Sequence, residues 1–352
     1  MLVKSMRTVA GLRGSEPLTA AYRAGLRSRT YGSASLNRPA AEPDVFPVTT
    51  VDGAKLRVHA YGPAEADAIV LIHGWSCCIE YWNPQINAFA ENFRVISYDQ
   101  RGHGDSGLGR IAPSGETLAD DLATVLDATL RPGQKALLVG HSMGGITIQA
   151  WAQRYPEQVA RRAAGVILAN TASKDIKNET DLLPLLNKQL SVGGNPLTLL
   201  GAAVRMPMFF AEALLFAPVP VPDVWPVGLA LKHRVMTARA TDEQVSFALG
   251  VVRSCRPLSR GLHAAALAEL DLGEAAAHLA AVPTTVIAGE HDKLLPERLS
   301  RPIVQHIVKA GGTVDYQVWP TGHLGNVEEA ERFNAEIARM AGVSRGVTAV
   351  AG

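Results

Sequence analysis

Four short, almost wholly apolar runs follow one another in the first half of the chain, and segments with a helical pattern separate them. The runs cover residues 68–73, 94–98, 135–140 and 165–169. The segments between them, at 81–92, 117–130 and 143–155, repeat apolar residues every three or four positions, as amphipathic helices do. Strands that are apolar on both faces and alternate with helices form a parallel sheet covered on both sides. The sequence therefore predicts an α/β protein.

Further strands extend the predicted sheet at both ends of the chain. Residues 45–50 and 55–61, joined across Asp52-Gly53, predict a hairpin before the first buried run. Residues 284–288 and 313–319 predict two later strands with helical patterns beside them. We therefore expect an eight-stranded, mostly parallel sheet with helices on both faces. This core is expected to comprise residues 44–171 and 261–343.

The segment between the sixth and seventh predicted strands, residues 172–260, has a different composition. Of the 50 residues from 182 to 231 only four are charged, and seven of the chain's 21 prolines fall there. These prolines exclude a long helix through the region. We expect short helices that form a lid over the sheet. A membrane hairpin is the alternative, and the prolines and scattered polar residues argue against it.

A glycine-rich turn follows the third buried run. Its sequence is Gly140-His141-Ser142-Met143-Gly144-Gly145, directly before a helical pattern. A serine at a tight turn from strand to helix has a strained backbone and points its hydroxyl out of the sheet, and only glycines beside it leave room for the turn. The helix dipole then favours negative charge near Ser142. The turn indicates a nucleophilic serine; an ordinary glycine-rich turn is the structural alternative.

A serine hydroxyl is a poor nucleophile at neutral pH, so this hypothesis requires a base and a group that orients the base. His323 lies in a loop of small residues after the last predicted strand, and Asp292 follows the strand before it. The chain order Ser142, Asp292, His323 matches one known catalytic scaffold. Glu290, two residues before Asp292, is the alternative acid.

These motifs resemble those of the α/β-hydrolase fold, and residues 45–342 are similar to its esterase-like and lipase-like serine hydrolases. The resemblance also rests on His73-Gly74-Trp75-Ser76 after the strand at 68–73 and on the loop 99–106. It implies that Asp292 rather than Glu290 is the acid, and that the backbone N–H groups of Trp75 and Met143 form the oxyanion hole. Some relatives have the acid after the sixth strand, where this chain has Asn170-Thr171.

A serine at the turn implies acyl transfer to water, because relatives that open epoxides or displace halide have an aspartate there. We expect a carboxylic ester hydrolase with an acyl-enzyme intermediate. Carbon–carbon bond hydrolases and cofactor-free perhydrolases of this fold remain alternatives, as does a non-catalytic ligand receptor. No cofactor and no metal is expected, since no histidine has a metal-ligand spacing to Cys or carboxylate residues.

The apolar side chains of the predicted lid favour a hydrophobic ester with a medium or long acyl group as the substrate. The residues expected to line the substrate pocket are Trp82, Met206, Phe209, Phe210 and Trp225. The structural alternative is that each of these side chains only docks the lid on the core.

The overall charge argues against nucleic acid as a partner, because 34 Lys and Arg residues face 33 Asp and Glu residues. The balance is uneven along the chain: residues 1–43 have seven basic and two acidic residues. We expect residues 1–43 to be a poorly ordered basic extension and residues 344–352 to be a tail. An organellar transit peptide, or contact of the extension with an anionic membrane, is the alternative.

The location is expected to be cytoplasmic, with a peripheral membrane contact left open. Lys4, Arg7 and Arg13 interrupt any apolar stretch near the first residue, which argues against a secretory signal peptide. No window approaches the roughly 18 consecutive apolar residues of a membrane-spanning helix. Three cysteines are too few for a disulfide framework in a chain of this size and fit a reducing compartment.

Overall fold

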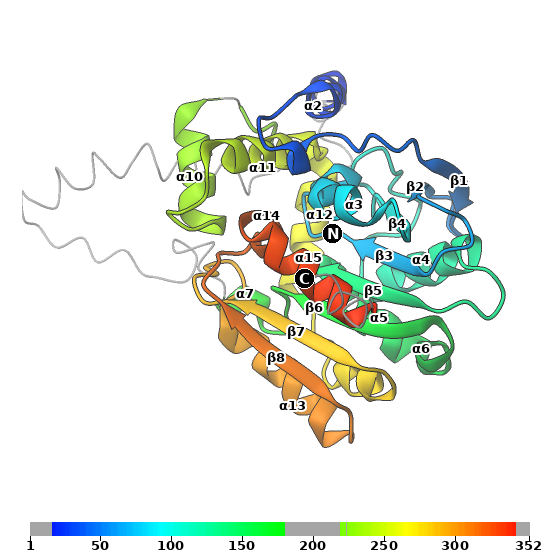
Figure 1. The fold of residues 1–352 in the computed structure, drawn as a ribbon. Helices are drawn as coiled ribbons and strands as arrows, with labels where there is room; N and C mark the ends of the chain where they lie inside the picture. The colour runs from blue at the N-terminus through cyan, green and yellow to red at the C-terminus, as the bar shows by residue number, and fades with distance from the viewer. Residues whose placement is uncertain (1–15, 180–218, 223, 343–352) are drawn as a thin grey trace, which may run out of the picture.

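An eight-stranded sheet forms the centre of the computed structural model, which describes residues 16–179, 219–222 and 224–342 (Figure 1). The strand order is β1-β2-β4-β3-β5-β6-β7-β8. β2 is antiparallel to β1 and β4, and the other neighbouring pairs are parallel. The strands are β1 (Asp44–Thr49), β2 (Lys55–Tyr61), β3 (Ala68–Ile72), β4 (Arg94–Tyr98), β5 (Ala136–His141), β6 (Ala163–Ala169), β7 (Thr284–Gly289) and β8 (Val314–Trp319). The predicted fold class is confirmed.

Each face of the sheet is buried beneath its own layer of helices. Alternate residues of a strand point to opposite faces, so Ile69 and Leu71 belong to one apolar core and Val70 and Ile72 to the other. The first core includes side chains of α3 (Asn83–Phe89) and α15 (Ala330–Met340). The second includes side chains of α4 (Gly115–Thr129), α5 (Met143–Arg154), α6 (Pro156–Arg162) and α13 (Arg301–Lys309). Short helices complete the layers: η2 (Ala34–Leu36), η3 (Ile79–Trp82), η4 (Ala275–Ala281), η5 (Glu297–Leu299) and α14 (Gly325–Glu328).

A capping box and a proline explain where two of the predicted helices begin. The helix expected at 117–130 begins at Gly115, because the Ser114 side chain accepts a hydrogen bond from Thr117 N and Thr117 bonds back to Ser114 N. The helix expected at 81–92 divides into η3 and α3. Pro84 lies at the start of α3, where its missing N–H costs nothing.

Four α-helices of the described residues lie between β6 and β7, before the short helix η4: α7 (Ile176–Glu179), α10 (Trp225–Val235), α11 (Asp242–Ser254) and α12 (Pro257–Ala268). Leu231 of α10 and Phe247 of α11 are buried in the core that also holds α3 and α15. The end of α10 contacts the loop after β8, where Val235 O accepts a hydrogen bond from His323 N at 2.8 Å. The inserted segment therefore lies against the carboxyl ends of the strands.

Residues 16–43, part of the segment for which we predicted poor order, are folded onto the rest of the chain. Helix α2 (Glu16–Ser28) packs against α11 (Figure 1). Arg23 is buried and pairs with Asp105 at 2.9 Å, and Arg27 pairs with Glu80 at 2.6 Å. The prediction is therefore corrected for these residues: Arg23 and Arg27 pair with carboxylates far away in the sequence.

The helices among the described residues are all too short or too polar to cross a membrane. The first 15 residues of the predicted extension and the tail predicted at 344–352 lie outside the described residues.

Candidate active site

Ser142 occupies the turn between β5 and α5 with a backbone conformation that L-residues rarely adopt. Its φ is 53° and its ψ is −118°. The turn is fixed by hydrogen bonds: Ser142 N donates to Ala169 O at 2.9 Å, and Ser142 O accepts from Gly145 N at 2.9 Å and from the Thr171 hydroxyl at 2.8 Å. A strained residue held by several surrounding bonds is typical of a functional position.

The glycines beside Ser142 are required by close backbone contacts. A Cβ on Gly140 would lie 2.6 Å from the Gly144 carbonyl group, and a Cβ on Gly144 would collide with the Ile72 carbonyl oxygen at the end of β3. Gly74, in the loop after β3, also lies close to the turn: its Cβ would lie 3.1 Å from the Ser142 Cβ. The loop after β3 is therefore packed directly against the serine.

His323 and Asp292, from the loops after β8 and β7, form a direct hydrogen bond. His323 Nδ1 lies 2.7 Å from Asp292 Oδ2, and both side chains are buried. Asp292 Oδ1 accepts from the backbone N–H groups of Leu294 and Leu295, each at 2.8 Å. Glu290, the alternative acid, is exposed. The structure therefore brings together the predicted His323 and Asp292 and leaves Glu290 outside the pair.

Asn170 is a member of this arrangement that the sequence did not reveal. Its Nδ2 donates to Asp292 Oδ2 at 3.0 Å and to Gly322 O at 3.1 Å, which joins the loops after β7 and β8. Its φ is 49°, a conformation that asparagine tolerates better than most residues. The sequence feature that could have indicated this role is the position of Asn170 at the carboxyl end of β6, where some relatives have the catalytic acid. In this chain that position holds an amide, which donates to the carboxylate of Asp292.

Ser142 and His323 line one small, mainly apolar cavity of about 60 Å³. Its walls come from the loop after β3, the serine turn, α10, α11 and the loops after β7 and β8. The lining residues are Trp75, Ser76, Cys77, His141, Ser142, Leu231, Val235, Val252, Leu294, His323 and Leu324.

Trp75 and Met143, the predicted oxyanion-hole donors, lie on the two backbone segments nearest the serine. Met143 is the first residue of α5, and the N–H groups in the first turn of a helix have no acceptor within that helix. Trp75 is held from its side chain, because Nε1 donates to Arg260 O of α12 at 3.0 Å. The next residue, Ser76, has a φ of 62°. This loop is therefore bent sharply beside the serine and anchored to the inserted segment.

Two buried histidines brace the site. His141 Nε2 lies 2.8 Å from the carbonyl oxygen of His323, and burial holds the pKa of His141 well below its usual range. A neutral ring that faces a carbonyl must donate from Nε2. His73 Nδ1 lies 2.7 Å from Gly74 O, and its Nε2 accepts from Gln100 N at 3.0 Å; burial lowers its pKa to about 4. Both rings therefore act as fixed neutral braces.

The expected pocket residues need correction. Trp82 is fully buried in the core, where its ring packs against Tyr81 and Phe333, and it does not line the cavity. Trp225 is 78% exposed at the start of α10. Leu231 and Val235, on later turns of α10, line the cavity instead. Met206, Phe209 and Phe210 lie outside the described residues.

The cysteine beside the serine is a poor nucleophile. Cys77 lines the cavity, but burial raises the pKa of its thiol far above the usual range. Burial also raises the pKa of Cys255, to about 11. Among the described residues, no group of three or more His, Cys, Asp or Glu side chains is arranged to hold a metal ion.

Comparisons with known proteins identify the family of this chain. The model of the alpha/beta hydrolase family matches residues 69–336. A bifunctional esterase/perhydrolase of Acinetobacter calcoaceticus is 26% identical, over 82% of this chain and 97% of the relative. The 3-oxoadipate enol-lactonase 1 of Acinetobacter baylyi is 29% identical, over 81% of this chain and 92% of the relative. The crystal structure of the enol-lactonase from Burkholderia xenovorans superposes with a TM-score of 0.61 at 25% identity and covers 84% of this chain and 99% of that one.

The chain therefore belongs to the alpha/beta hydrolase family, as the sequence motifs indicated. Its relatives include an esterase/perhydrolase and enol-lactonases, all at modest sequence identity.

Proposed function

We propose that this protein is a serine hydrolase that cleaves a carboxylic ester through an acyl-enzyme intermediate. The observation that carries the proposal is the 2.7 Å contact between His323 Nδ1 and Asp292 Oδ2, together with the cavity that His323 and Ser142 both line. In this role Ser142 is the nucleophile, His323 the general base and Asp292 the group that orients and stabilises the imidazole.

In the first step His323 Nε2 takes the hydroxyl proton as Ser142 Oγ attacks the ester carbonyl carbon. The carbonyl oxygen becomes an oxyanion, which the N–H groups of Trp75 and Met143 and the positive end of α5 stabilise. Collapse of this intermediate breaks the bond to the alkoxy group, and the His323 imidazolium gives its proton to the leaving alcohol. Water, deprotonated by His323, then attacks the acyl-enzyme and releases the acid.

The cavity lined by the described residues favours a short acyl group, whereas the sequence led us to expect a medium or long one. About 60 Å³ holds only a few atoms, roughly the space of a few water molecules. Its apolar walls, formed by Leu231, Val252 and Leu324, favour a hydrocarbon group. We therefore propose an ester with a small, apolar acyl part.

Hydrolysis of a lactone is a second candidate, because a lactone is a cyclic ester and reacts through the same acyl-enzyme. The enol-lactonases among the relatives, which align over most of this chain, favour it. Perhydrolysis is the same acyl transfer with hydrogen peroxide in place of water, and one relative is named an esterase/perhydrolase. A profile of turnover over aryl esters, lactones and thioesters, with and without peroxide, separates these candidates.

The proposal is tested by labelling the full chain with a fluorophosphonate and mapping the adduct by mass spectrometry. We expect one adduct, on Ser142, and none in Ser142→Ala. Ser173→Ala is the matched control, because Ser173 is also buried but bonds to Gln149 at 2.7 Å. Labelling that persists in Ser142→Ala would refute the assignment. Among aryl esters from acetate to octanoate, acetate to butanoate should react fastest.

A further inference from the structure

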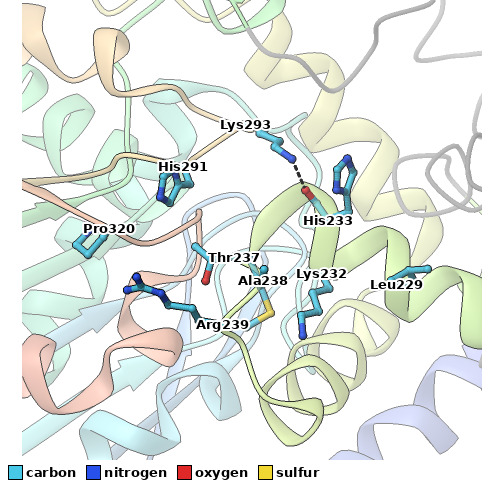
Figure 2. Close-up of a pocket in the computed structure, with 10 residues that line it drawn as sticks. Leu229, Lys232, His233, Thr237, Ala238, Arg239, His291, Lys293 and Pro320 are labelled. Carbon is cyan, nitrogen blue, oxygen red and sulfur yellow. Dashed lines mark hydrogen bonds between the residues drawn. The ribbon is translucent and has the colours of Figure 1, made fainter.

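The loops that contain the acid and the base of the candidate active site are held by contacts with α10. Lys293 Nζ, next to Asp292, donates to His233 O of α10 at 2.9 Å (Figure 2). His323 N donates to Val235 O, at the end of the same helix, at 2.8 Å. The proposed oxyanion-hole donors lie on other segments, one in the loop after β3 and one at the start of α5. The distance between these two donors must be fixed by other contacts.

The side chain of Gln100 connects the backbone segments of the two oxyanion-hole donors. Gln100 follows β4 and is buried. Its Nε2 donates to His73 O at 2.5 Å, and its Oε1 accepts from the Thr147 hydroxyl at 2.8 Å. His73 is two residues before Trp75, and Thr147 lies about one turn after Met143 on α5. The Gln100 amide therefore spans from one half of the oxyanion hole to the other.

Further hydrogen bonds extend this connection at both ends. The Thr147 hydroxyl oxygen lies 2.9 Å from Met143 O. At the other end Gln100 N donates to His73 Nε2 at 3.0 Å, so the ring proton is on Nδ1, which donates to Gly74 O at 2.7 Å. Gln100 therefore holds both the ring and the backbone of His73, and it reaches Met143 through a single hydroxyl group.

The order of the strands explains why a side chain from the loop after β4 can make this connection. β3 lies between β4 and β5, and Ile72, its last residue, is paired with Tyr98 and with Gly140. A side chain that follows β4 can therefore reach across the end of β3 to the helix that follows β5. The space there is small, because a Cβ on Gly144 of α5 would lie only 3.0 Å from His73 O.

We propose that Gln100 is a positioning residue that sets the spacing of the Trp75 and Met143 N–H groups around the oxyanion. Gln100 does not line the catalytic cavity, so it acts through the residues to which it bonds. The inference rests on the proposed function, because an oxyanion forms only if Ser142 attacks a carbonyl group. A donor that moves away from its position stabilises the developing charge less well, and the loss is confined to the transition state.

The variant Gln100→Met removes the amide and keeps the length of the side chain. Acylation and deacylation both pass through an oxyanion, so both rates fall together and KM stays nearly constant. With an aryl acetate, well below the unfolding temperature, we expect kcat to fall at least about tenfold and KM to change less than about twofold. A kcat close to that of the unmodified protein would overturn the inference.

The variant Thr147→Val tests the same connection from α5 and still decides the question if Gln100→Met does not fold. It removes only a hydroxyl group, so we expect a smaller loss of kcat, about threefold. The double variant should match Gln100→Met alone, because both changes break one chain of hydrogen bonds. Full activity of Thr147→Val, or losses that multiply in the double variant, would contradict a single connection.

The matched control for the loss of a buried amide is Gln85→Met. Gln85, on α3, is also buried, and its Nε2 donates to Asn326 O and to Asn334 Oδ1, each at 3.1 Å. These bonds join α3 to α14 and α15 and do not involve the loop after β3 or α5. We expect kcat to change less than about twofold in this variant. An equal loss of kcat in Gln85→Met and Gln100→Met would overturn the inference.

Fluorophosphonate labelling separates this inference from the proposed function. If the unmodified protein is neither labelled on Ser142 nor able to turn over an aryl ester, the proposed function is wrong and the inference is wrong with it. If the unmodified protein is labelled and active, and Gln100→Met is as active, only the role of Gln100 is wrong.

Discussion

Replacing Asn170 by aspartate places a second carboxylate against Asp292 with almost no change in shape. In the native chain Asn170 Nδ2 lies 3.0 Å from Asp292 Oδ2, and both side chains are buried. Aspartate also tolerates the φ of 49° at this position. The variant therefore changes the electrostatics of the site and leaves its packing intact.

The size of the effect follows from that distance. Two unit charges 3.0 Å apart repel by about 5.5 kcal/mol at an effective dielectric constant of about 20. The pair escapes this repulsion by retaining one proton, which raises a carboxyl pKa in the folded state. The unfolded chain loses the same proton near pH 4, so stability falls as the pH rises above that value, by about 1.4 kcal/mol per unit. We expect Asn170→Asp to lower the free energy of unfolding by about 2 kcal/mol at pH 5 and by about 4 kcal/mol more at pH 8.

The measurement is urea-induced unfolding at pH 5 and pH 8, followed by tryptophan fluorescence. The double variant Asn170→Asp with Asp292→Asn has one carboxylate again and completes a mutant cycle. It should recover most of the stability that the single variant loses at pH 8. An equal loss at both pH values, or a double variant as unstable as the single one, would refute the reasoning.

Three further predictions test a third buried histidine, the glycine turn and the cavity. This histidine is His103, in the loop after β4, whose Nδ1 lies 3.0 Å from Arg101 O. Burial lowers the pKa of His103 to about 3, so as the pH falls the unfolded chain binds a proton before the folded chain does, and stability is lost below about pH 6.5. His103→Asn should therefore flatten the slope of unfolding free energy against pH, between pH 6 and pH 4, by about 1.4 kcal/mol per pH unit. An unchanged slope would contradict this. Gly144→Ala should destabilise the protein by more than about 3 kcal/mol in thermal unfolding, because the new Cβ collides with a carbonyl oxygen of β3. Gly25→Ala is the control, because a Cβ there meets open space, and it should not destabilise the protein. Equal unfolding temperatures for the two variants would contradict the packing argument. Leu231→Trp should reduce kcat/KM for an aryl acetate at least about tenfold, because the larger side chain fills the cavity. Trp225→Ala should leave kcat/KM unchanged, because Trp225 is exposed. The reverse result would indicate that Trp225, as predicted from the sequence, lines the substrate pocket.

Features coded by neighbouring residues could be predicted from the sequence. The apolar runs that became β3 to β6 are buried on both faces, so their composition alone indicates central strands. Ser142 has its glycines and its strand and helix directly beside it in the sequence. His323 and Asp292 were found because each follows a strand, and the carboxyl ends of parallel strands meet at one edge of a sheet.

Features that depend on distant partners could not be predicted. The arginines of α2 look like a solvated basic stretch until Asp105 and Glu80 are brought beside them. Asn170 gains its role only when the loops after β7 and β8 lie next to it. Trp225 and Leu231 share a helix with apolar residues all around it, so composition did not reveal which of them faces solvent.

The most direct test of the proposed mechanism is to trap the acyl-enzyme. The protein is mixed rapidly with an aryl acetate, quenched in acid within the first turnover and digested, and the acylated peptide is identified by mass spectrometry. The mechanism predicts an acetyl group on Ser142, formed at the rate of the aryl alcohol burst and absent in Ser142→Ala. Turnover with the acetyl group on Cys77 or another residue of the cavity, or with none on Ser142 during a burst, would contradict it.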